Sequence, residues 1–257
     1  MTIRAFLLDF DGVIATAGRP IPGAIATLQA LQRDAVPFRI LTNTTLHPRG
    51  ALTEALARFG VEVSPDQFIT PASAARQLLL SSGRPRLALV AAPAIVSEFA
   101  DLELVPDDAD EGADYVVVGD MGDDLTPRAL NRAFRQLHSG AGLIGLGLSR
   151  YWQAPDGLRL DAGAFVKALE FASGKSATIV GKPSPTFFQT GIEQLGLDPA
   201  EIAMVGDDVV SDIGAGQLVG LVGVLVRTGK FRPGDLQRSV VPDAVVDSIA
   251  DIPALLG

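Results

Sequence analysis

Short apolar runs alternate with amphipathic stretches from the start of the chain. Residues 5–10 (AFLLDF) have the continuous apolar character of a buried strand. Residues 23–34 (GAIATLQALQRD) repeat apolar positions at helical spacing, and residues 37–43 (PFRILTN) are typical of a second strand. A strand, a helix and a strand in this order predict a parallel βαβ unit.

The same alternation returns near the end of the chain. Because strands and helices alternate in both places, we expect an α/β fold with a doubly wound parallel sheet, which binds ligands at the carboxyl ends of its strands. The late segments predicted as strands are 177–181, 202–208, 221–229 and 244–249, and those predicted as helices are 184–196 and 212–220.

Residues 80–178 contain strands and helices of their own. This block includes three apolar runs, RLALVAA, YVVVGD and GLIGLGLS, and the helical pattern TPRALNRAFRQLH. We therefore predict a core domain formed by residues 1–79 and 179–257, with residues 80–178 inserted as a smaller α/β domain.

Composition narrows the class of protein. The chain has 257 residues, of which 47% are hydrophobic and 20% are charged, as expected for a folded globular protein. A net charge of −9 argues against nucleic acid or an anionic membrane as the partner, because both require clustered basic residues. The absence of cysteine excludes disulfides, thiolate metal sites and a cysteine nucleophile. Without a signal-peptide or membrane-span pattern, we expect a cytoplasmic protein.

Four polar stretches follow predicted strands. They are residues 9–12 (DFDG), 42–45 (TNTT), 181–183 (GKP) and 206–208 (GDD), the last with Asp212 shortly after it. The carboxyl ends of parallel strands meet at one edge of a sheet, so we expect all four stretches to converge there.

Gathered aspartates need a cation or a shared proton. Carboxylates about 4 Å apart repel one another by about 1–4 kcal/mol per pair, depending on the surroundings. A cluster of oxygen ligands without Cys or His favours a hard ion, most simply Mg²⁺. Lys182 adds positive charge, and Thr42 and Asn43 add neutral donors suited to phosphate oxygens. The stretches together predict a pocket for phosphoryl groups of a small phosphorylated substrate.

The residue types present suggest roles in phosphoryl transfer. Since the chain has no cysteine and no G-x-S-x-G motif, we predict Asp9 as the nucleophile, forming an aspartyl phosphate. Asp11 would act as acid towards the leaving oxygen and then as base towards water. Lys182 would stabilise the charge of the transferred group.

Two roles are open for most of the remaining polar residues. We predict Asp207 as a metal ligand and Asp212 as the holder of a metal-bound water, with Asp208 open to either role. As an alternative, Asp208 and Asp212 are ordinary acidic residues at a helix N-terminus. Likewise, Thr42 and Asn43 can simply cap the next helix.

The motifs also carry a family resemblance. In order along the chain, DFDGV, LTNTT, VGKPSP and MVGDDVVSDIGAG resemble the four motifs of haloacid dehalogenase (HAD) superfamily phosphatases. The insertion between the second and third motifs resembles the C2-type cap domain of subfamily IIA, the branch that contains the 4-nitrophenylphosphatases. The resemblance extends over nearly the whole chain.

The resemblance implies a Rossmann-like core and Mg²⁺-dependent hydrolysis of phosphomonoesters, phosphoanhydrides or N-phosphoryl compounds through an aspartyl phosphate. It implies that Asp9 is nucleophile and metal ligand, that Asp11 is acid and base and ligates through its backbone carbonyl, and that Asp207 is the third ligand. It also implies a homodimer formed through the cap. The phosphate-binding residues that it implies are Thr42, Asn43 and Lys182.

Two other functions use similar residues. A metal-independent dehalogenase on the same scaffold would use Asp9 without requiring Asp11. A receiver-like signalling module also combines acidic residues, a phosphorylated Asp, a Thr and a Lys on a doubly wound sheet. Dependence on Mg²⁺ distinguishes the first of these from a phosphatase, and repeated turnover distinguishes the second.

Overall fold

A computed structural model describes residues 2–83, 85–154 and 157–257, with only the backbone described at 152–154. Its contacts divide the chain into two compact units, which we call the core unit and the insert unit. The predicted boundaries of the inserted domain, 80–178, stay a prediction. The core unit comprises the residues up to Thr42, Arg49–Ile69 and Lys182–Gly257, and the insert unit comprises Asn43–Pro48 and Thr70–Gly181.

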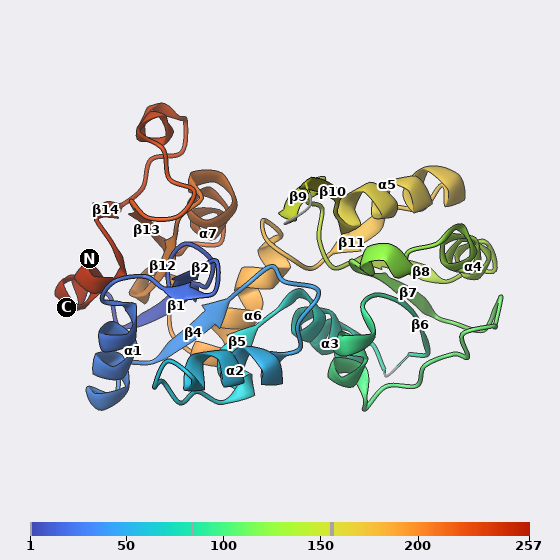
Figure 1. The fold of residues 1–257 in the computed structure, drawn as a ribbon, viewed down its shortest axis with the longest axis horizontal. Helices are drawn as coiled ribbons and strands as arrows, with labels where there is room; N and C mark the ends of the chain where they lie inside the picture. The colour runs from blue at the N-terminus through green and yellow to red at the C-terminus, as the bar shows by residue number, and fades with distance from the viewer. Residues whose placement is uncertain (1, 84, 155–156) are drawn as a thin grey trace. The chain divides into compact units, whose positions relative to one another are not determined.

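The core unit is built on a six-stranded sheet in the order β14-β13-β12-β1-β4-β5, in which every pairing is parallel. Figure 1 shows blue strands from the beginning of the chain in this sheet beside orange and red strands from its end. The predicted α/β fold with a parallel sheet is confirmed. The strands are β1 (Ala5–Asp9), β4 (Phe38–Leu41), β5 (Phe68–Ile69), β12 (Ile202–Gly206), β13 (Val222–Val226) and β14 (Ala244–Val246).

The central strands are apolar because the sheet is buried on both faces. Every residue of β1, β12 and β13 is buried, as expected for parallel strands between layers of helices. A short antiparallel hairpin follows β1. It consists of β2 (Ala15–Thr16) and β3 (Arg19–Pro20).

Helices α1 and α6 of the core unit begin and end within one residue of their predicted segments, whereas α2 was not predicted. Helix α6 has Ser184 at its N-cap position and Pro185 in its first turn, and it ends at Gly196, whose φ of 64° is left-handed. The helix predicted at 212–220 begins earlier, as a π-helical turn, Val209–Gly214. The α-helices are α1 (Ala24–Arg33), α2 (Arg49–Ala57), α6 (Pro185–Leu195) and α7 (Ala215–Leu218).

The insert unit has a second parallel sheet of four strands, in the order β11-β8-β7-β6. The strand predicted at 177–181 was grouped with the core sheet, and this is wrong. It is β11, which pairs with β8 in the insert unit, where Thr178 is opposite Ile144. The strands are β6 (Leu87–Val90), β7 (Tyr115–Val118), β8 (Gly142–Gly145) and β11 (Ala177–Ile179).

The described part of the insert unit also contains three α-helices, an antiparallel hairpin and short 3-10 turns. Helix α4 begins as its sequence predicts, because the Thr126 side chain accepts a hydrogen bond from the N–H of Ala129 and Pro127 occupies the first turn. Within the described residues, no helix combines the length and apolar character that a bilayer crossing requires. The elements are α3 (Pro71–Ser81), α4 (Pro127–His138), α5 (Ala162–Ser173), β9 (Tyr151–Ala154) and β10 (Gly157–Leu160).

Candidate active site

Two buried aspartates lie at the carboxyl ends of neighbouring strands. Asp9 is the last residue of β1, and Asp207 comes directly after β12, which pairs with β1. Their exposed fractions are only 4% and 1%. Parallel register therefore brings together two carboxylates that are almost 200 residues apart in the sequence.

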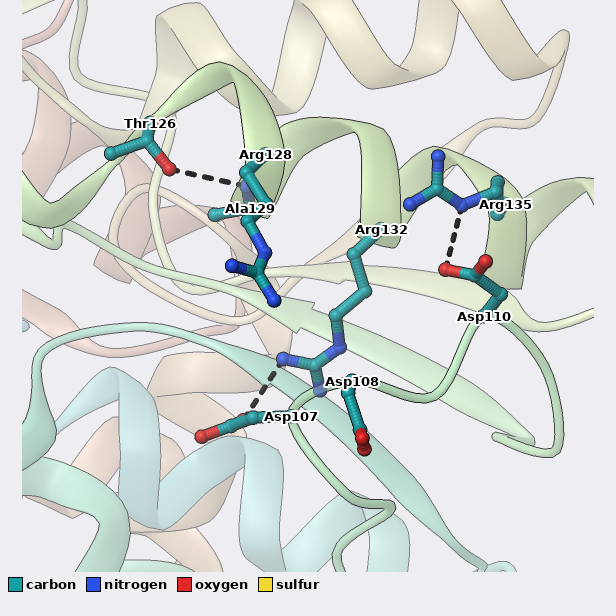
Figure 2. A pocket seen from close by; sticks show the side chains of 8 residues that line it. All are labelled: Asp107, Asp108, Asp110, Thr126, Arg128, Ala129, Arg132 and Arg135. Carbon is teal, nitrogen blue, oxygen red and sulfur yellow. Dashed lines mark hydrogen bonds and ion pairs between the residues drawn. The ribbon is translucent and has the colours of Figure 1, made fainter.

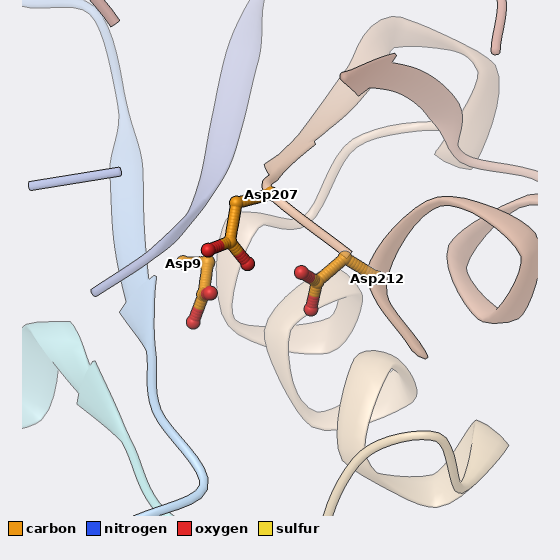
Figure 3. Close-up of side chains that lie close together, drawn as sticks. All are labelled: Asp9, Asp207 and Asp212. Atoms are coloured by element: carbon orange, nitrogen blue, oxygen red, sulfur yellow. The ribbon is translucent and has the colours of Figure 1, made fainter. Parts of the chain in front are cut away.

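The π-helical turn after β12 adds a third carboxylate. Asp212 is 1% exposed, and one carboxylate oxygen from each of Asp9, Asp207 and Asp212 lies within 4.8 Å of the others. Figure 3 shows the three side chains pointing towards one another. The Gly206 backbone passes close beneath this turn, since a Cβ on Gly206 would lie 2.3 Å from the Cβ of Asp212. We call these three residues the acidic cluster.

Lys182 connects two members of the acidic cluster. Its Nζ lies 2.6 Å from Oδ1 of Asp9 and 2.8 Å from Oδ1 of Asp212, and the side chain is buried. The expectation that all four polar stretches end strands of one sheet is wrong for this one. Lys182 follows β11 of the other sheet and enters the core unit just before α6.

The electrostatics of the cluster show that one ammonium does not balance three carboxylates. Burial raises the pKa of Asp9 to about 8; Lys182 opposes this increase, and the charge of Asp212 adds to it. Burial alone would lower the pKa of Lys182, but the charges of Asp212 and Asp9 outweigh burial and raise it. Lys182 therefore keeps its charge, and the cluster lacks positive charge when all three carboxylates are ionised.

Asp207 retains an oxygen that suits a cation. Its Oδ2 accepts a hydrogen bond of 2.7 Å from the N–H of Lys230, whereas its Oδ1 is buried and has no hydrogen-bond partner within the described residues. Burial raises the pKa of Asp207, although the Lys230 N–H partly offsets this effect. A hard cation would supply the charge that this oxygen-only cluster lacks, so the residues fit Mg²⁺.

The backbones of two glycines pack closely against Oδ2 of Asp207. A Cβ on Gly12 would lie 1.9 Å from Oδ2 of Asp207, and a Cβ on Gly229 would lie 2.0 Å from the same oxygen. Both glycines have positive φ angles, 85° and 64°. The Thr228 hydroxyl donates a hydrogen bond of 2.5 Å to the Gly12 carbonyl and joins the two segments. This loop was not predicted from the sequence, in which the glycine of RTGK, three residues after β13, is the available signal.

Asp11 and Asp208 lie outside the acidic cluster. The Asp11 side chain is exposed in the turn after β1. Oδ1 of Asp208 accepts hydrogen bonds of 3.0 Å from the N–H groups of both Val210 and Ser211, and so caps the π-helical turn. Burial would raise the pKa of Asp208, but these hydrogen bonds outweigh burial and lower it. The capping role left open for Asp208 is the one that the geometry supports.

Thr42 and Asn43 follow β4 and belong to different units. Thr42, in the core unit, is buried, and its N–H donates to the carbonyl of Ile69. Asn43 belongs to the insert unit, where its side-chain oxygen lies 3.1 Å from the position of a Cβ on Gly181. Helix α2 begins only at Arg49, so neither residue is at its N-cap. Their predicted role in phosphate binding stays a prediction.

Known proteins resemble the chain over nearly its full length. A family model described as haloacid dehalogenase-like hydrolase matches residues 6–104, and a second model for HAD-like hydrolases matches residues 179–252. Phospholysine phosphohistidine inorganic pyrophosphate phosphatase of Rattus norvegicus is 36% identical, covering 99% of this chain and 94% of the relative. Human haloacid dehalogenase-like hydrolase domain-containing protein 2 is also 36% identical, covering 92% of this chain and 88% of the relative.

A solved structure shares the same fold. The p-nitrophenyl phosphatase of Archaeoglobus fulgidus matches with a TM-score of 0.90 and 27% identity, and the alignment covers 100% of both chains. Sequence relatives and this structural neighbour thus include named phosphatases that match the whole chain, both sheets included. We conclude that the chain belongs to the haloacid dehalogenase-like hydrolase family and is related to its phosphatases.

Proposed function

We propose that this hydrolase is a Mg²⁺-dependent phosphatase that acts on small phosphorylated compounds through an aspartyl phosphate on Asp9. The observation that carries the proposal is the acidic cluster, in which three buried carboxylates lie close together and two of them, Asp9 and Asp212, pair with the ammonium of Lys182. The names of the relatives support phosphate transfer as the chemistry. The substrates we propose are phosphomonoesters, phosphoanhydrides and N-phosphoryl compounds.

In the first half of the reaction, a carboxylate oxygen of Asp9 attacks phosphorus, and the bond from phosphorus to the leaving oxygen or nitrogen breaks. Asp11, on the exposed turn after β1, protonates the leaving atom. In the second half, Asp11 takes a proton from water, which attacks phosphorus and releases phosphate and free Asp9. Lys182 keeps the Asp9 carboxylate oriented and offsets negative charge throughout.

A bound Mg²⁺ would neutralise charge on the phosphoryl group and align it for attack. Asp9 and Asp207 are the side chains we propose as ligands, together with the backbone carbonyl of Asp11. Asp212 would hold a metal-bound water, since one of its oxygens already pairs with Lys182. Asp208 contributes by fixing the turn that carries Asp212.

We also propose that residues 80–178 act as a cap that limits access to small substrates. The chain leaves the core unit after Ile69 and returns at Lys182, so the insertion ends at a residue that contacts the acidic cluster. Because Lys182 connects the insertion to the core unit, a movement of the insertion would be transmitted to the acidic cluster through this residue. A homodimer formed through this cap stays a prediction.

A phosphate-release screen tests the proposed function. Purified protein is incubated with a panel of phosphomonoesters, pyrophosphate and N-phosphoryl amino acids, with Mg²⁺ or with EDTA. We expect many equivalents of phosphate per protein with Mg²⁺ and almost none with EDTA. Release of one equivalent only would favour a receiver-like module. Halide release that is independent of metal would favour a dehalogenase.

Replacing Asp11 with Asn tests the second half of the reaction. We expect turnover to fall by about 10²–10⁴-fold, because the amide can neither donate a proton to the leaving group nor accept one from water. Any phosphoenzyme that forms should decay slowly, so acid-quenched protein from a ³²P-labelled substrate should retain label. Normal decay of the labelled protein would contradict this role for Asp11.

A further inference from the structure

The insert unit contains two cavities that the proposed function does not use. Their volumes are about 470 and 430 Å³, within the range of small-molecule sites. Figure 2 shows the first cavity, which lies between arginines of α4 and acidic residues of the loop before β7. Its charged lining residues are Asp107, Asp108, Asp110, Arg128, Arg132 and Arg135.

Arg132 is the unusual member of this lining. Its side chain is only 12% exposed, and an ion pair joins its Nη1 to Oδ1 of Asp107 at 2.9 Å. Nε and Nη2 are buried without a hydrogen-bond partner among the described residues. A guanidinium carries five N–H donors, and buried donors left unpaired are unfavourable. The Asp107 side chain is 99% exposed, so solvent screening leaves it a weak partner.

The second cavity provides an apolar surface beside the same arginine. It shares Asp107, Ala129 and Arg132 with the first cavity. Its other walls are mainly apolar side chains. These include Leu89, Val96, Leu104, Val105 and Met121. A positive charge short of acceptors therefore lies next to an apolar surface, and Arg128 adds a second positive charge to the lining of the first cavity.

We propose that these two cavities form a binding site for a small amphipathic anion. The anionic head binds Arg132 in place of the exposed carboxylate of Asp107, and the apolar body lies against the wall that contains Val96 and Met121. Without a ligand, the Asp107 carboxylate pairs with the Arg132 guanidinium. An incoming anion must therefore compete with Asp107 for this arginine. This competition predicts opposite effects for the two partners of one ion pair.

Octanoate is a suitable probe, with 1-octanol as its uncharged counterpart. Binding to the full-length protein is measured by isothermal titration calorimetry. We expect Arg132→Met to weaken octanoate binding by at least about tenfold, because a hydrogen-bonded charge partner is lost. Asp107→Asn should strengthen binding several-fold, because it frees the guanidinium. Octanol should bind at least about tenfold more weakly than octanoate.

The Arg33–Asp34 ion pair supplies matched controls, since it is exposed and lies in the core unit. Arg33→Met and Asp34→Asn make the same changes in charge and should leave octanoate binding unchanged. Circular dichroism verifies that each variant is folded. If Arg132→Met does not fold, the proposal is tested by Asp107→Asn, whose substituted side chain is exposed, and by the comparison of octanol with octanoate. Equal binding of octanoate by wild type and Asp107→Asn, or equal binding of octanol and octanoate, would overturn the proposal.

Discussion

Asp9→Asn is expected to lower phosphate release by at least about 10⁴-fold, since a side-chain amide cannot attack phosphorus and nucleophile removal has losses of this order. The fold should be retained. Asn has the same shape, and its Oδ1 can still accept the hydrogen bond of 2.9 Å that the Phe10 N–H donates to Asp9. Removing one of three mutually repelling carboxylates also relieves the cluster. Phosphate release and thermal unfolding are measured on the same preparation.

Asp66→Asn is the matched control for Asp9→Asn. Asp66 makes an ion pair with Arg49, and its side chain is 91% exposed, so this substitution should alter neither rate nor stability appreciably. Activity of Asp9→Asn within about tenfold of wild type, in protein shown by mass spectrometry not to have deamidated, would exclude Asp9 as the nucleophile.

Lys182→Met is expected to impair both catalysis and stability. The variant loses the ammonium that contacts Asp9 and Asp212, so two buried carboxylates lose their cationic partner. Removing one partner of a buried pair costs about 3–5 kcal/mol of unfolding free energy. Loss of a charge-stabilising donor lowers turnover by about 10²–10³-fold. Urea unfolding without metal and phosphate release with Mg²⁺ measure the two effects.

The stability loss in Lys182→Met should grow as pH rises. Burial raises the pKa of Asp9 in the folded protein to about 8 from its ordinary value of 3.8, so stability falls as pH rises through this range and Asp9 ionises. Lys182 lowers this pKa in the wild type, so its removal raises the pKa of Asp9 further and makes ionisation of Asp9 more destabilising. Lys167→Met is the control, because Lys167 is 64% exposed in its ion pair with Glu170. A stability loss that does not vary with pH would contradict the assigned cause.

The parts of the fold that follow from local pattern were predictable from the sequence. The buried strands β1, β4, β12 and β13 lie within segments predicted as strands, because continuous apolar runs mark strands buried on both faces. Helix α6 has the caps expected from Ser184, Pro185 and Gly196. The four ordered motifs were also sufficient to identify the family, which the comparisons confirm.

Features that depend on distant contacts were not predictable. Strand β11 has the same apolar character as a core strand, and only its pairing with β8 places it in the second sheet. The position of Asp212 depends on a π-helical turn. A π-helix closes its hydrogen bonds one residue later than an α-helix, and this changes which side chain of the turn faces the end of β12. The glycine among residues 228–230 signals a loop, but the sequence does not show that this loop forms a wall for Asp207, because that contact joins segments far apart in the chain.

The close approach of Gly12, Gly229 and Asp207 also bears on how the protein is made. During synthesis, both Asp9 and Asp207 leave the ribosome before the loop that contacts Asp207 Oδ2 through the Lys230 N–H. A nascent chain that ends at Val226 thus carries every carboxylate of the site while the wall that orients one of them is still missing. The surroundings of Asp207 are therefore complete only after residues 228–230 have been synthesised.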